Sequence, residues 1–255
     1  MTWSVGAGLE GKGVIVTGSA RGIGKAVAEA FAAAGAKVML ADIDREPLEN
    51  VLASLPGEGH AATTIDLRNL EAQRELITRT RREFGNLYAL AHVAGVLQRR
   101  PSLNDITEED WDRQIDVNLK ATFFLCRSAA EAMKEQGEGG RIIAFTSQAW
   151  WTGSFGGGAV YAASKGGVVS MLRSFARSYG AYNITVNTVA PGQVNTPMLM
   201  TGLDPAVLKA MTDATPLKRV AEPEEMAGTV VFLASKHAGF ITGATINTTG
   251  GFLMY

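Results

Sequence analysis

A tyrosine and a lysine lie one helical turn apart in the segment Tyr161-Ala162-Ala163-Ser164-Lys165. On a helix, residues four apart share one face, so these two side chains would lie together. A free tyrosine has a pKa of about 10 and is a poor base at neutral pH. A neighbouring ammonium stabilises the phenolate and lowers that pKa. The pair therefore has the composition of a general acid–base.

A glycine-rich turn directly follows the apolar run Val14-Ile15-Val16 and reads Thr17-Gly18-Ser19-Ala20-Arg21-Gly22-Ile23-Gly24. Between a strand and a helix, such glycines permit a tight turn and bring the backbone and the helix N-terminus close to a phosphate. The turn therefore predicts a bound dinucleotide, which adds hydride chemistry to the acid–base pair.

The choice of dinucleotide rests on Asp42, which ends the next predicted strand. A carboxylate there can accept hydrogen bonds from the ribose 2′-hydroxyl and would repel a 2′-phosphate. Arg21 is the opposing feature, because a basic residue in the glycine turn could reach a phosphate. Ile43 offers no second positive group, so we expect NAD rather than NADP.

Together these segments resemble the short-chain dehydrogenase/reductase family in its compact single-domain form, over about residues 11–251. The resemblance implies reversible oxidation of a secondary alcohol to a ketone, with Tyr161 as general acid–base. It also implies that Lys165 binds the nicotinamide ribose and that Ser147 donates a hydrogen bond to the substrate oxygen. Asn118 matches the residue that kinks its helix and holds a water connecting Lys165 to solvent.

The resemblance extends to two further cofactor segments. In His92-Val93-Ala94-Gly95 the small Ala94-Gly95 pair, which lets the cofactor lie close, matches the family's Asn-Asn-Ala-Gly. Both asparagines are replaced, so the polar contacts that brace the sheet centre in the family are expected to differ. His92 is expected to be a buried, hydrogen-bonded strand residue. The segment Pro191-Gly192, followed by Thr196, resembles the one that grips the nicotinamide carboxamide, with contacts from the Val194 backbone and the Thr196 hydroxyl.

Asp66-Leu67 resembles the family's adenine-contacting acid, although Asp66 could instead cap the following helix. The expected cofactor contacts are Gly18, Arg21, Gly22, Ile23, Gly24, Asp42, Asp66, Leu67, Ala94, Gly95, Tyr161, Lys165, Pro191, Gly192, Val194 and Thr196.

The substrate pocket is expected to draw on the segments after Ser147, before Tyr161 and after Gly192, by resemblance to the family. They contain Gln148, Trp150, Trp151, Phe155, Gln193, Met198, Leu199, Met200 and Leu203. We expect Ser147, Gln148, Trp150, Tyr161 and Gln193 to contact the substrate. Two substrate classes remain: a sugar or polyol read by the two glutamines, or a cyclic or hydrophobic alcohol on the indoles. Trp150 and Trp151 could instead pack at a subunit contact.

Apolar runs alternate with helical patterns, which predicts an α/β doubly wound Rossmann fold with about seven parallel strands and helices on both faces. Strands are expected at 14–17, 37–42, 60–65, 87–93, 141–146, 184–189 and 245–247. A helix should start after Thr107, which has the composition of an N-cap, and run to about Gln136. Another should carry Tyr161 and end near Tyr179. Residues 1–255 form a single domain in this interpretation, with a substrate lid at about 193–221.

The 255 residues include 24 basic and 25 acidic side chains, so the net charge is −1. This balance gives no reason to expect nucleic acid or an anionic membrane as a partner, and no metal site is indicated. The single cysteine, Cys126, is compatible with a reducing compartment and is expected to be buried. The N-terminus has no signal-peptide pattern, so we expect a cytoplasmic protein. The resemblance implies a homotetramer, and the apolar tail 252–255 is expected to pack on a neighbouring subunit.

Two other functions fit parts of this pattern. One is an NADPH-dependent 3-oxoacyl-carrier-protein reductase, which Asp42 and the near-neutral charge disfavour because such an enzyme needs positive groups for the phosphate and for its acidic carrier. The other is a non-catalytic nucleotide-binding scaffold, which the complete set Asn118, Ser147, Tyr161 and Lys165 disfavours.

Overall fold

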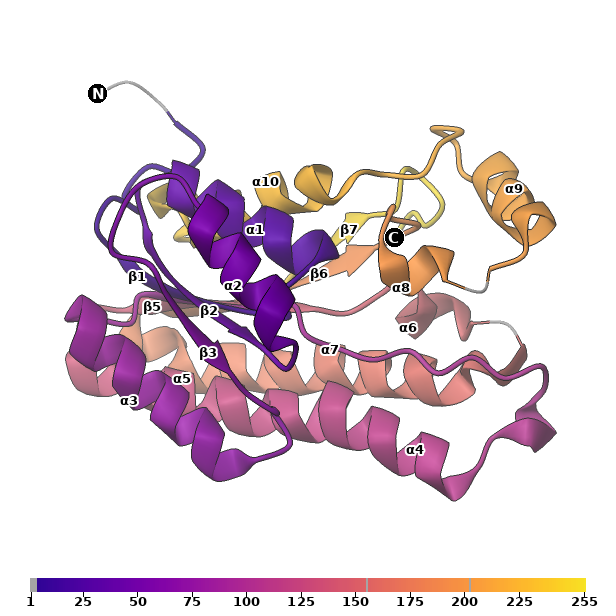
Figure 1. The fold of residues 1–255 in the computed structure, drawn as a ribbon, viewed down its shortest axis with the longest axis horizontal. Helices are drawn as coiled ribbons and strands as arrows, with labels where there is room; N and C mark the ends of the chain where they lie inside the picture. Colours follow the sequence, from indigo (N-terminus) through magenta and orange to yellow (C-terminus); the bar gives the residue numbers. More distant parts are fainter. Residues whose placement is uncertain (1–3, 155, 202) are drawn as a thin grey trace.

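A seven-stranded parallel sheet forms the centre of the computed structural model, which describes residues 4–154, 156–201 and 203–255 (Figure 1). The strands are β1 Gly13–Thr17, β2 Lys37–Asp42, β3 Ala61–Thr64, β4 Ala89–His92, β5 Gly140–Phe145, β6 Ile184–Pro191 and β7 Thr245–Thr248. Their order is β3-β2-β1-β4-β5-β6-β7, and every neighbouring pair is parallel. The strand order reverses between β1 and β4, and open α/β sheets bind ligands at the carboxyl ends of the strands at such a point.

Helices cover both faces of the sheet. They are α1 Gly22–Ala33, α2 Arg45–Ser54, α3 Leu70–Phe84, α4 Glu108–Ile115, α5 Ala121–Gln136, α6 Ala149–Thr152, α7 Ala159–Tyr179, α8 Pro197–Met200, α9 Pro205–Ala214 and α10 Pro223–Ala234. One layer contains α1, α2 and α10, and the other contains α3, α5 and α7 (Figure 1). No helix in the described part of the chain is long and apolar enough to cross a membrane.

Successive strand residues face opposite layers, which gives the molecule two cores. In β1, Val14 and Val16 belong to the core beneath α1 and α10, whereas Ile15 belongs to the core beneath α3, α5 and α7. Val38 and Met39 of β2 separate in the same way. Because both faces are buried, the strands are nearly continuous apolar runs rather than alternating ones. The predicted doubly wound parallel fold is confirmed, and all seven expected strands lie within two residues of the observed bounds.

The helix predicted after Thr107 is interrupted near its middle. Thr107 caps it as expected, since its hydroxyl accepts a hydrogen bond from the Asp110 N–H at 3.1 Å and the Asp110 carboxylate accepts one from the Thr107 N–H. After α4, however, residues Asp116–Lys120 form a π-helical turn before α5 continues to Gln136. Such single wide turns often occur at functional sites, and this one contains Asn118.

The segment after β6 includes residues 193–221, where the sequence predicts a substrate lid. It contains α8 and α9, and its two ends are joined by a parallel bridge between Val194 and Ala221. In that bridge the Asn195 N–H donates to the Ala221 carbonyl at 2.8 Å, and the Ala221 N–H donates to the Gln193 carbonyl at 2.9 Å. Figure 1 shows α6, α8, α9 and the C-terminus at the same end of the molecule. Phe155, expected in the substrate pocket, lies outside the described residues.

Candidate active site

The glycine turn leaves the N-terminus of α1 open to an anion. Its N-cap, Arg21, makes no side-chain capping bond, and the N–H groups of Gly22, Ile23 and Gly24 have no hydrogen-bond partner among the described residues. A β-carbon at Gly24 would overlap the Gly18 carbonyl oxygen. The chain therefore packs too tightly here for side chains, and the helix presents its N–H groups and positive dipole end to a phosphate.

The backbone is also closely packed where the residues that follow β1 meet those that follow β4. Gly18 has φ of +67°, and a β-carbon there would lie 2.8 Å from the Ala94 backbone nitrogen. A β-carbon on Gly22 would lie 3.2 Å from the Thr196 Cγ2 atom. The glycine turn, the Ala94-Gly95 pair and the Thr196 segment, all expected to contact the cofactor, thus meet at the carboxyl ends of the strands.

The Asp42 carboxylate organises the turn that faces it. Its two oxygens accept hydrogen bonds from the Ala20 N–H at 2.9 Å and from the Asp44 N–H at 3.1 Å. A carboxylate has about four acceptor positions, so it retains capacity for a ribose hydroxyl. Arg21, the opposing feature in the sequence, forms an ion pair with Asp44, and its charge is therefore compensated within the protein.

Lys165 is buried beneath Tyr161 on α7. Its ammonium lies 5.8 Å from the centroid of the tyrosine ring and donates a hydrogen bond to the Phe145 carbonyl at 2.9 Å. The Thr146 hydroxyl also donates to the Lys165 carbonyl at 2.9 Å, which fixes α7 against the end of β5. Burial lowers the pKa of Lys165 to about 8. The ammonium is therefore the main species at neutral pH and can release its proton slightly above it.

The Tyr161 environment differs in one respect from the sequence interpretation. Burial is the strongest influence and raises the pKa of Tyr161, while a hydrogen bond from Ser147 and the positive charge of Arg99 act in the opposite direction. The sequence predicted that Lys165 would supply the stabilising charge, but the cation with a resolved effect on this pKa is Arg99. Ser147 is close to Tyr161 as predicted, whereas Arg99 was missed because nothing in its local sequence marks it.

Asn118 holds the loop that follows β4. Its Nδ2 donates to the Val96 carbonyl at 2.9 Å and to the Ser164 hydroxyl at 3.1 Å, and its Oδ1 accepts from the Val96 N–H at 2.8 Å. A β-carbon on Gly95 would lie 3.2 Å from both Asn118 Oδ1 and Lys165 Nζ. The π-helical turn therefore brings Asn118 beside Gly95 and the lysine. Its role in holding a water stays a prediction.

His92 is the buried strand residue that the sequence predicted. Its Nδ1 lies 2.8 Å from the Thr17 hydroxyl and its Nε2 lies 2.8 Å from the Thr122 hydroxyl. The Thr122 hydroxyl donates to the Asn118 carbonyl at 2.7 Å, so it must accept from a protonated Nε2. Burial and the nearby Lys165 charge lower the pKa of His92 to about 3, which keeps the ring neutral. His92 thus supplies hydrogen bonds at the centre of the sheet. They differ, as expected, from those that the family's asparagines make.

Within the described part of the chain, the segment expected to hold the carboxamide contains a free backbone donor at Val194. In the bridge to Ala221, the N–H of Val194 is left without a partner among the described residues. A β-carbon on Gly192 would lie 2.9 Å from the Thr249 Cα atom, so the chain is closely packed there. The Thr196 hydroxyl accepts from the Leu199 N–H at 3.3 Å and so caps α8.

Asp66 and Leu67 follow β3, as expected of an adenine-binding position. The Asp66 carboxylate pairs with Arg68, whose hydrogen bonds lower the Asp66 pKa. The alternative role for Asp66, capping the next helix, is wrong. Asn69 caps α3 by accepting from the N–H groups of residues 71 and 72 at 3.0 and 3.1 Å.

Three of the expected substrate contacts carry buried polar atoms with no partner among the described residues. They are Gln148 through its side-chain oxygen, Trp150 through its indole nitrogen and Gln193 through its Nε2, and the first two lie on the segment directly after Ser147. Tyr255 packs on this segment. Its ring stacks on Trp151 at 5.4 Å and meets the edge of Trp150 at 5.6 Å. The C-terminal residue therefore contacts the tryptophans of its own chain.

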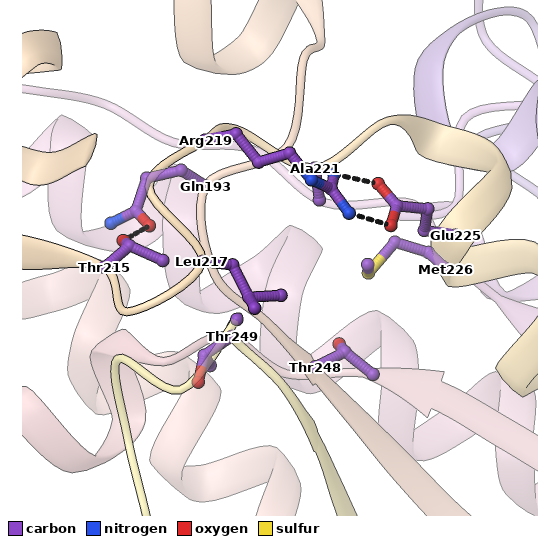
Figure 2. Close-up of a pocket in the computed structure, with 10 residues that line it drawn as sticks. Gln193, Thr215, Leu217, Arg219, Ala221, Glu225, Met226, Thr248 and Thr249 are labelled. Carbon is purple, nitrogen blue, oxygen red and sulfur yellow. Dashed lines mark hydrogen bonds and ion pairs between the residues drawn. The ribbon is translucent and has the colours of Figure 1, made fainter. Parts of the chain in front are cut away.

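Gln193 lines a cavity separate from Ser147, Tyr161 and Lys165. Its Oε1 lies 3.3 Å from the Thr215 hydroxyl, and its buried Nε2 has no partner among the described residues. Figure 2 shows it on one side of a cavity of about 190 Å³, with the Arg219–Glu225 ion pair on the other. None of Ser147, Tyr161 and Lys165 lines this cavity. The structure does not bring Gln193 to the tyrosine, and its contact with substrate stays a prediction.

Comparison with known proteins agrees with this geometry. A family profile described as enoyl-(acyl carrier protein) reductase matches residues 18–253. The human (3R)-3-hydroxyacyl-CoA dehydrogenase is 34% identical over 94% of this chain and 95% of its own. The 2-dehydro-3-deoxy-D-gluconate 5-dehydrogenase of Escherichia coli is 35% identical over 96% of each chain.

Among solved structures, a short-chain dehydrogenase/reductase from Brucella melitensis, described as a glucose/ribitol dehydrogenase, superimposes with a TM-score of 0.90. It is 35% identical, with 97% of this chain and 98% of that chain covered. This chain belongs to the short-chain dehydrogenase/reductase family and is an oxidoreductase that acts on CH–OH groups.

Proposed function

We propose that this protein is an NAD-dependent dehydrogenase that interconverts a secondary alcohol and a ketone of the sugar or polyol class. The observation that carries the proposal is the convergence of Ser147, Tyr161 and Lys165 at the sheet edge onto which the uncapped N-terminus of α1 opens. This arrangement combines a proton-transfer group with a dinucleotide cradle.

The residues of the cradle fit NAD, which when bound supplies the hydride acceptor or donor. The α1 N–H groups would hold the pyrophosphate, and Asp42 would accept from the adenosine ribose. The free Val194 N–H would contact the carboxamide, and Lys165 would bind the nicotinamide ribose. The Arg21–Asp44 ion pair supports NAD over NADP, because it compensates the one cation placed in the turn for a 2′-phosphate.

Tyr161 would move the proton. During alcohol oxidation its phenolate oxygen accepts the hydroxyl proton as the carbon loses hydride, and the phenol returns that proton during reduction. Ser147 would donate a hydrogen bond to the substrate oxygen in both directions. The guanidinium of Arg99 and the hydrogen bond from Ser147 favour the phenolate, which counteracts the effect of burial. The Lys165 ammonium, 5.8 Å from the ring centroid, would act in the same direction.

The segment after Ser147 supports this substrate class. The unpartnered Gln148 oxygen can accept a hydrogen bond, and the unpartnered Trp150 N–H can donate one. Buried polar atoms without partners are costly, and a ligand bearing several hydroxyls would satisfy both. An apolar cyclic alcohol would leave them unsatisfied, so the sugar or polyol class is favoured. A carrier-protein reductase finds less support, because the cofactor cradle favours NAD.

The proposed assembly is a homotetramer in the cytoplasm. An apolar groove runs between the π-helical turn, α5 and α7, and is lined by Leu119, Phe123, Phe124 and Met171. Gly167 lets Leu119 of the same chain pack closely against α7, since a β-carbon at position 167 would lie 3.0 Å from the Leu119 side chain. Two copies of this surface can pack against each other and bury the groove.

We assign residues 193–221, which include α8 and α9, as the substrate lid.

The test is a turnover assay that follows the nicotinamide absorbance with alditols, sugar acids, cyclic alcohols and hydroxyacyl esters. We expect NAD reduction with a polyhydroxylated substrate. Tyr161→Phe should retain NAD binding and lose about 10²–10⁴-fold in kcat. Turnover restricted to hydroxyacyl esters with NADP would establish the carrier-type reductase instead, and absence of turnover with every substrate would reject the enzymatic proposal.

A further inference from the structure

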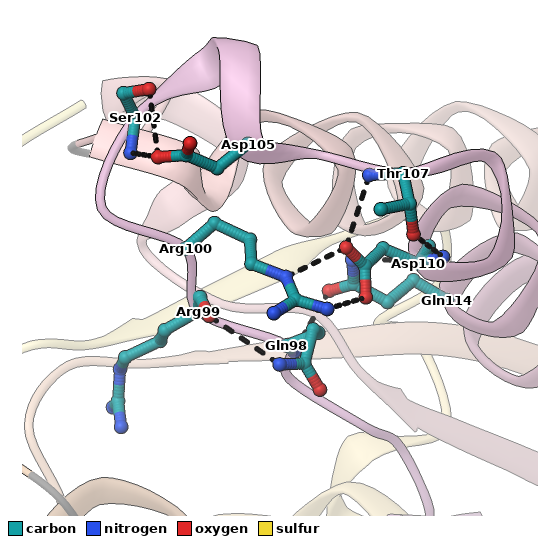
Figure 3. A network of polar contacts seen from close by, with 8 residues as sticks. All are labelled: Gln98, Arg99, Arg100, Ser102, Asp105, Thr107, Asp110 and Gln114. Carbon is teal, nitrogen blue, oxygen red and sulfur yellow. Dashed lines mark hydrogen bonds and ion pairs between the residues drawn. The ribbon is translucent and has the colours of Figure 1, made fainter.

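The loop after β4 is fixed on both sides of Arg99. Before it, the Gln98 N–H donates to the Gln114 side chain at 3.1 Å. After it, Arg100 forms a two-bond ion pair with Asp110 at 2.7 and 2.8 Å. Figure 3 shows the Arg99 side chain extending away from this network, with its guanidinium on the opposite side from Asp110. The contacts of Gln98 and Arg100 therefore fix the loop backbone at Arg99 without using the Arg99 side chain.

The Arg99 guanidinium lacks a carboxylate partner. It is exposed, and its hydrogen bond is a long one of 3.5 Å from Nη2 to the Leu199 carbonyl on α8. No aspartate or glutamate in the described ranges lies within ion-pair distance of it. The neighbouring Arg100 is paired with Asp110, and Arg21 is paired with Asp44. Arg99 thus retains most of its donors for another ligand.

Arg99 lies against α8, within electrostatic range of Tyr161. Its contact with Leu199 places it against α8, the first helix after the Val194–Thr196 segment. Its positive charge also acts on Tyr161. Val96, three residues earlier in the loop, is held by Asn118. The guanidinium therefore lies between the loop after β4 and α8, close enough to influence the tyrosine.

We propose that Arg99 binds a carboxylate of the substrate, so that the substrate of this enzyme is a polyhydroxylated acid or the corresponding keto acid. The inference rests on the proposed function and narrows its substrate class. A guanidinium presents donors in a planar fork that matches a carboxylate. A phosphate of an acyl-CoA is separated from the reacting carbonyl by the long pantetheine arm. Because the Arg99 guanidinium is close enough to Tyr161 to affect it, this group is better placed to bind the carboxylate of a small substrate than the distant phosphate of an acyl-CoA.

The experiment compares matched substrates that differ only in the charged group. Threonate and threitol, xylonate and xylitol, and gluconate and sorbitol each exchange a carboxylate for a hydroxymethyl group. Wild type should have a higher kcat/KM for the acid in the pair that it uses. In Arg99→Gln this acid-to-alditol ratio should fall roughly 10- to 100-fold, the range expected for a hydrogen bond to a charged group. Arg99→Lys, which retains charge without the planar fork, should give an intermediate ratio.

The ratio isolates carboxylate binding, because any change in the Tyr161 pKa affects both members of a pair equally. Arg74→Gln on α3, whose cation pairs with Glu71, is the matched control and should leave the ratio unchanged. Equal losses for acid and alditol in Arg99→Gln, or wild-type turnover of alditols with no preference for acids, would overturn this inference and leave the proposed function standing. No turnover of any member of the wider substrate panel would overturn both.

Discussion

The Nε2 atom of His92 lies 2.8 Å from the hydroxyl of Thr122, and that hydroxyl donates in turn to the Asn118 carbonyl at 2.7 Å. On its other side the imidazole meets Thr17 at the end of β1. One neutral ring therefore joins β1, β4 and the π-helical turn. The sequence predicted that His92 is a buried, hydrogen-bonded strand residue, and the structure identifies its two partners, Thr17 and Thr122.

His92→Ala should destabilise the fold by about 2–4 kcal/mol, because it leaves a cavity and removes one hydrogen bond from each of two buried hydroxyls. His92→Asn should cost less, since an amide can replace one of the two bonds. Urea unfolding at pH 7 measures both. Arg74→Ala, on the exposed face of α3, is the control and should change stability by less than about 0.5 kcal/mol. A His92→Ala protein as stable as this control would show that the hydrogen bonds of His92 with Thr17 and Thr122 do not stabilise the fold.

Lys165 predicts a specific dependence of stability on pH. Its pKa is about 8 in the folded protein, below its ordinary value of 10.5. The unfolded chain therefore binds this proton more tightly, and stability rises with pH between about 8 and 10.5. Lys165→Met removes that titration. The free energy of unfolding of wild type relative to Lys165→Met should increase by up to about 3 kcal/mol across that range, as measured by denaturation at pH 7, 9 and 10. A difference that stays constant with pH would contradict the buried ammonium.

The Arg21–Asp44 ion pair predicts how cofactor preference can be changed. Asp44→Asn should release the Arg21 guanidinium and raise kcat/KM with NADP several-fold, because an exposed ion pair of up to about 1 kcal/mol no longer competes with the 2′-phosphate. The double variant Arg21→Ala/Asp44→Asn should lose this gain. Asp42→Ala should lower kcat/KM with NAD. Wild-type preference for NADP would refute the charge argument and point to Arg21 as the determinant.

The contact between Trp151 and Tyr255 predicts that the C-terminal residue influences substrate binding. Tyr255→Ala removes two aromatic contacts, each worth about 0.5–1.5 kcal/mol, from the segment that follows Ser147. We expect KM for the substrate to rise several-fold with a smaller change in kcat, and tryptophan fluorescence to change. Met254→Ala, whose side chain is 81% exposed, is the control. Unaltered KM and fluorescence in Tyr255→Ala would show that the tail is not coupled to this segment.

The groove between α5 and α7 predicts the subunit contact. Phe124→Lys places a third positive charge in the groove beside Lys120 and Arg127, and burying an uncompensated charge in an interface is strongly unfavourable. The variant should dissociate at micromolar concentration, as measured by light scattering, while circular dichroism shows the fold retained. Deleting residues 252–255 should weaken assembly or thermal stability less, because Tyr255 packs on its own chain. A full-length protein that is already monomeric would contradict the proposed tetramer.

The sequence alone predicted the features that depend on local spacing. Alternating apolar runs and helical periodicity predicted the doubly wound sheet, because strands buried on both faces and covering helices have distinct patterns. Thr107 and the acids after it predicted the start of a helix. The four-residue separation of Tyr161 and Lys165 placed both on one face of α7, and the glycines marked the turn whose backbone packs against Ala94.

The tertiary structure decided which distant groups became partners. His92 meets Thr122, 30 residues away, and Trp151 meets Tyr255 at the end of the chain. These pairings depend on how helices pack on the sheet, and no local pattern encodes them. The same holds for Arg99 and Arg100, which are adjacent and chemically identical in the sequence. The structure pairs Arg100 with Asp110 of α4 and places Arg99 against Leu199 of α8, so the two side chains contact different helices that come later in the chain.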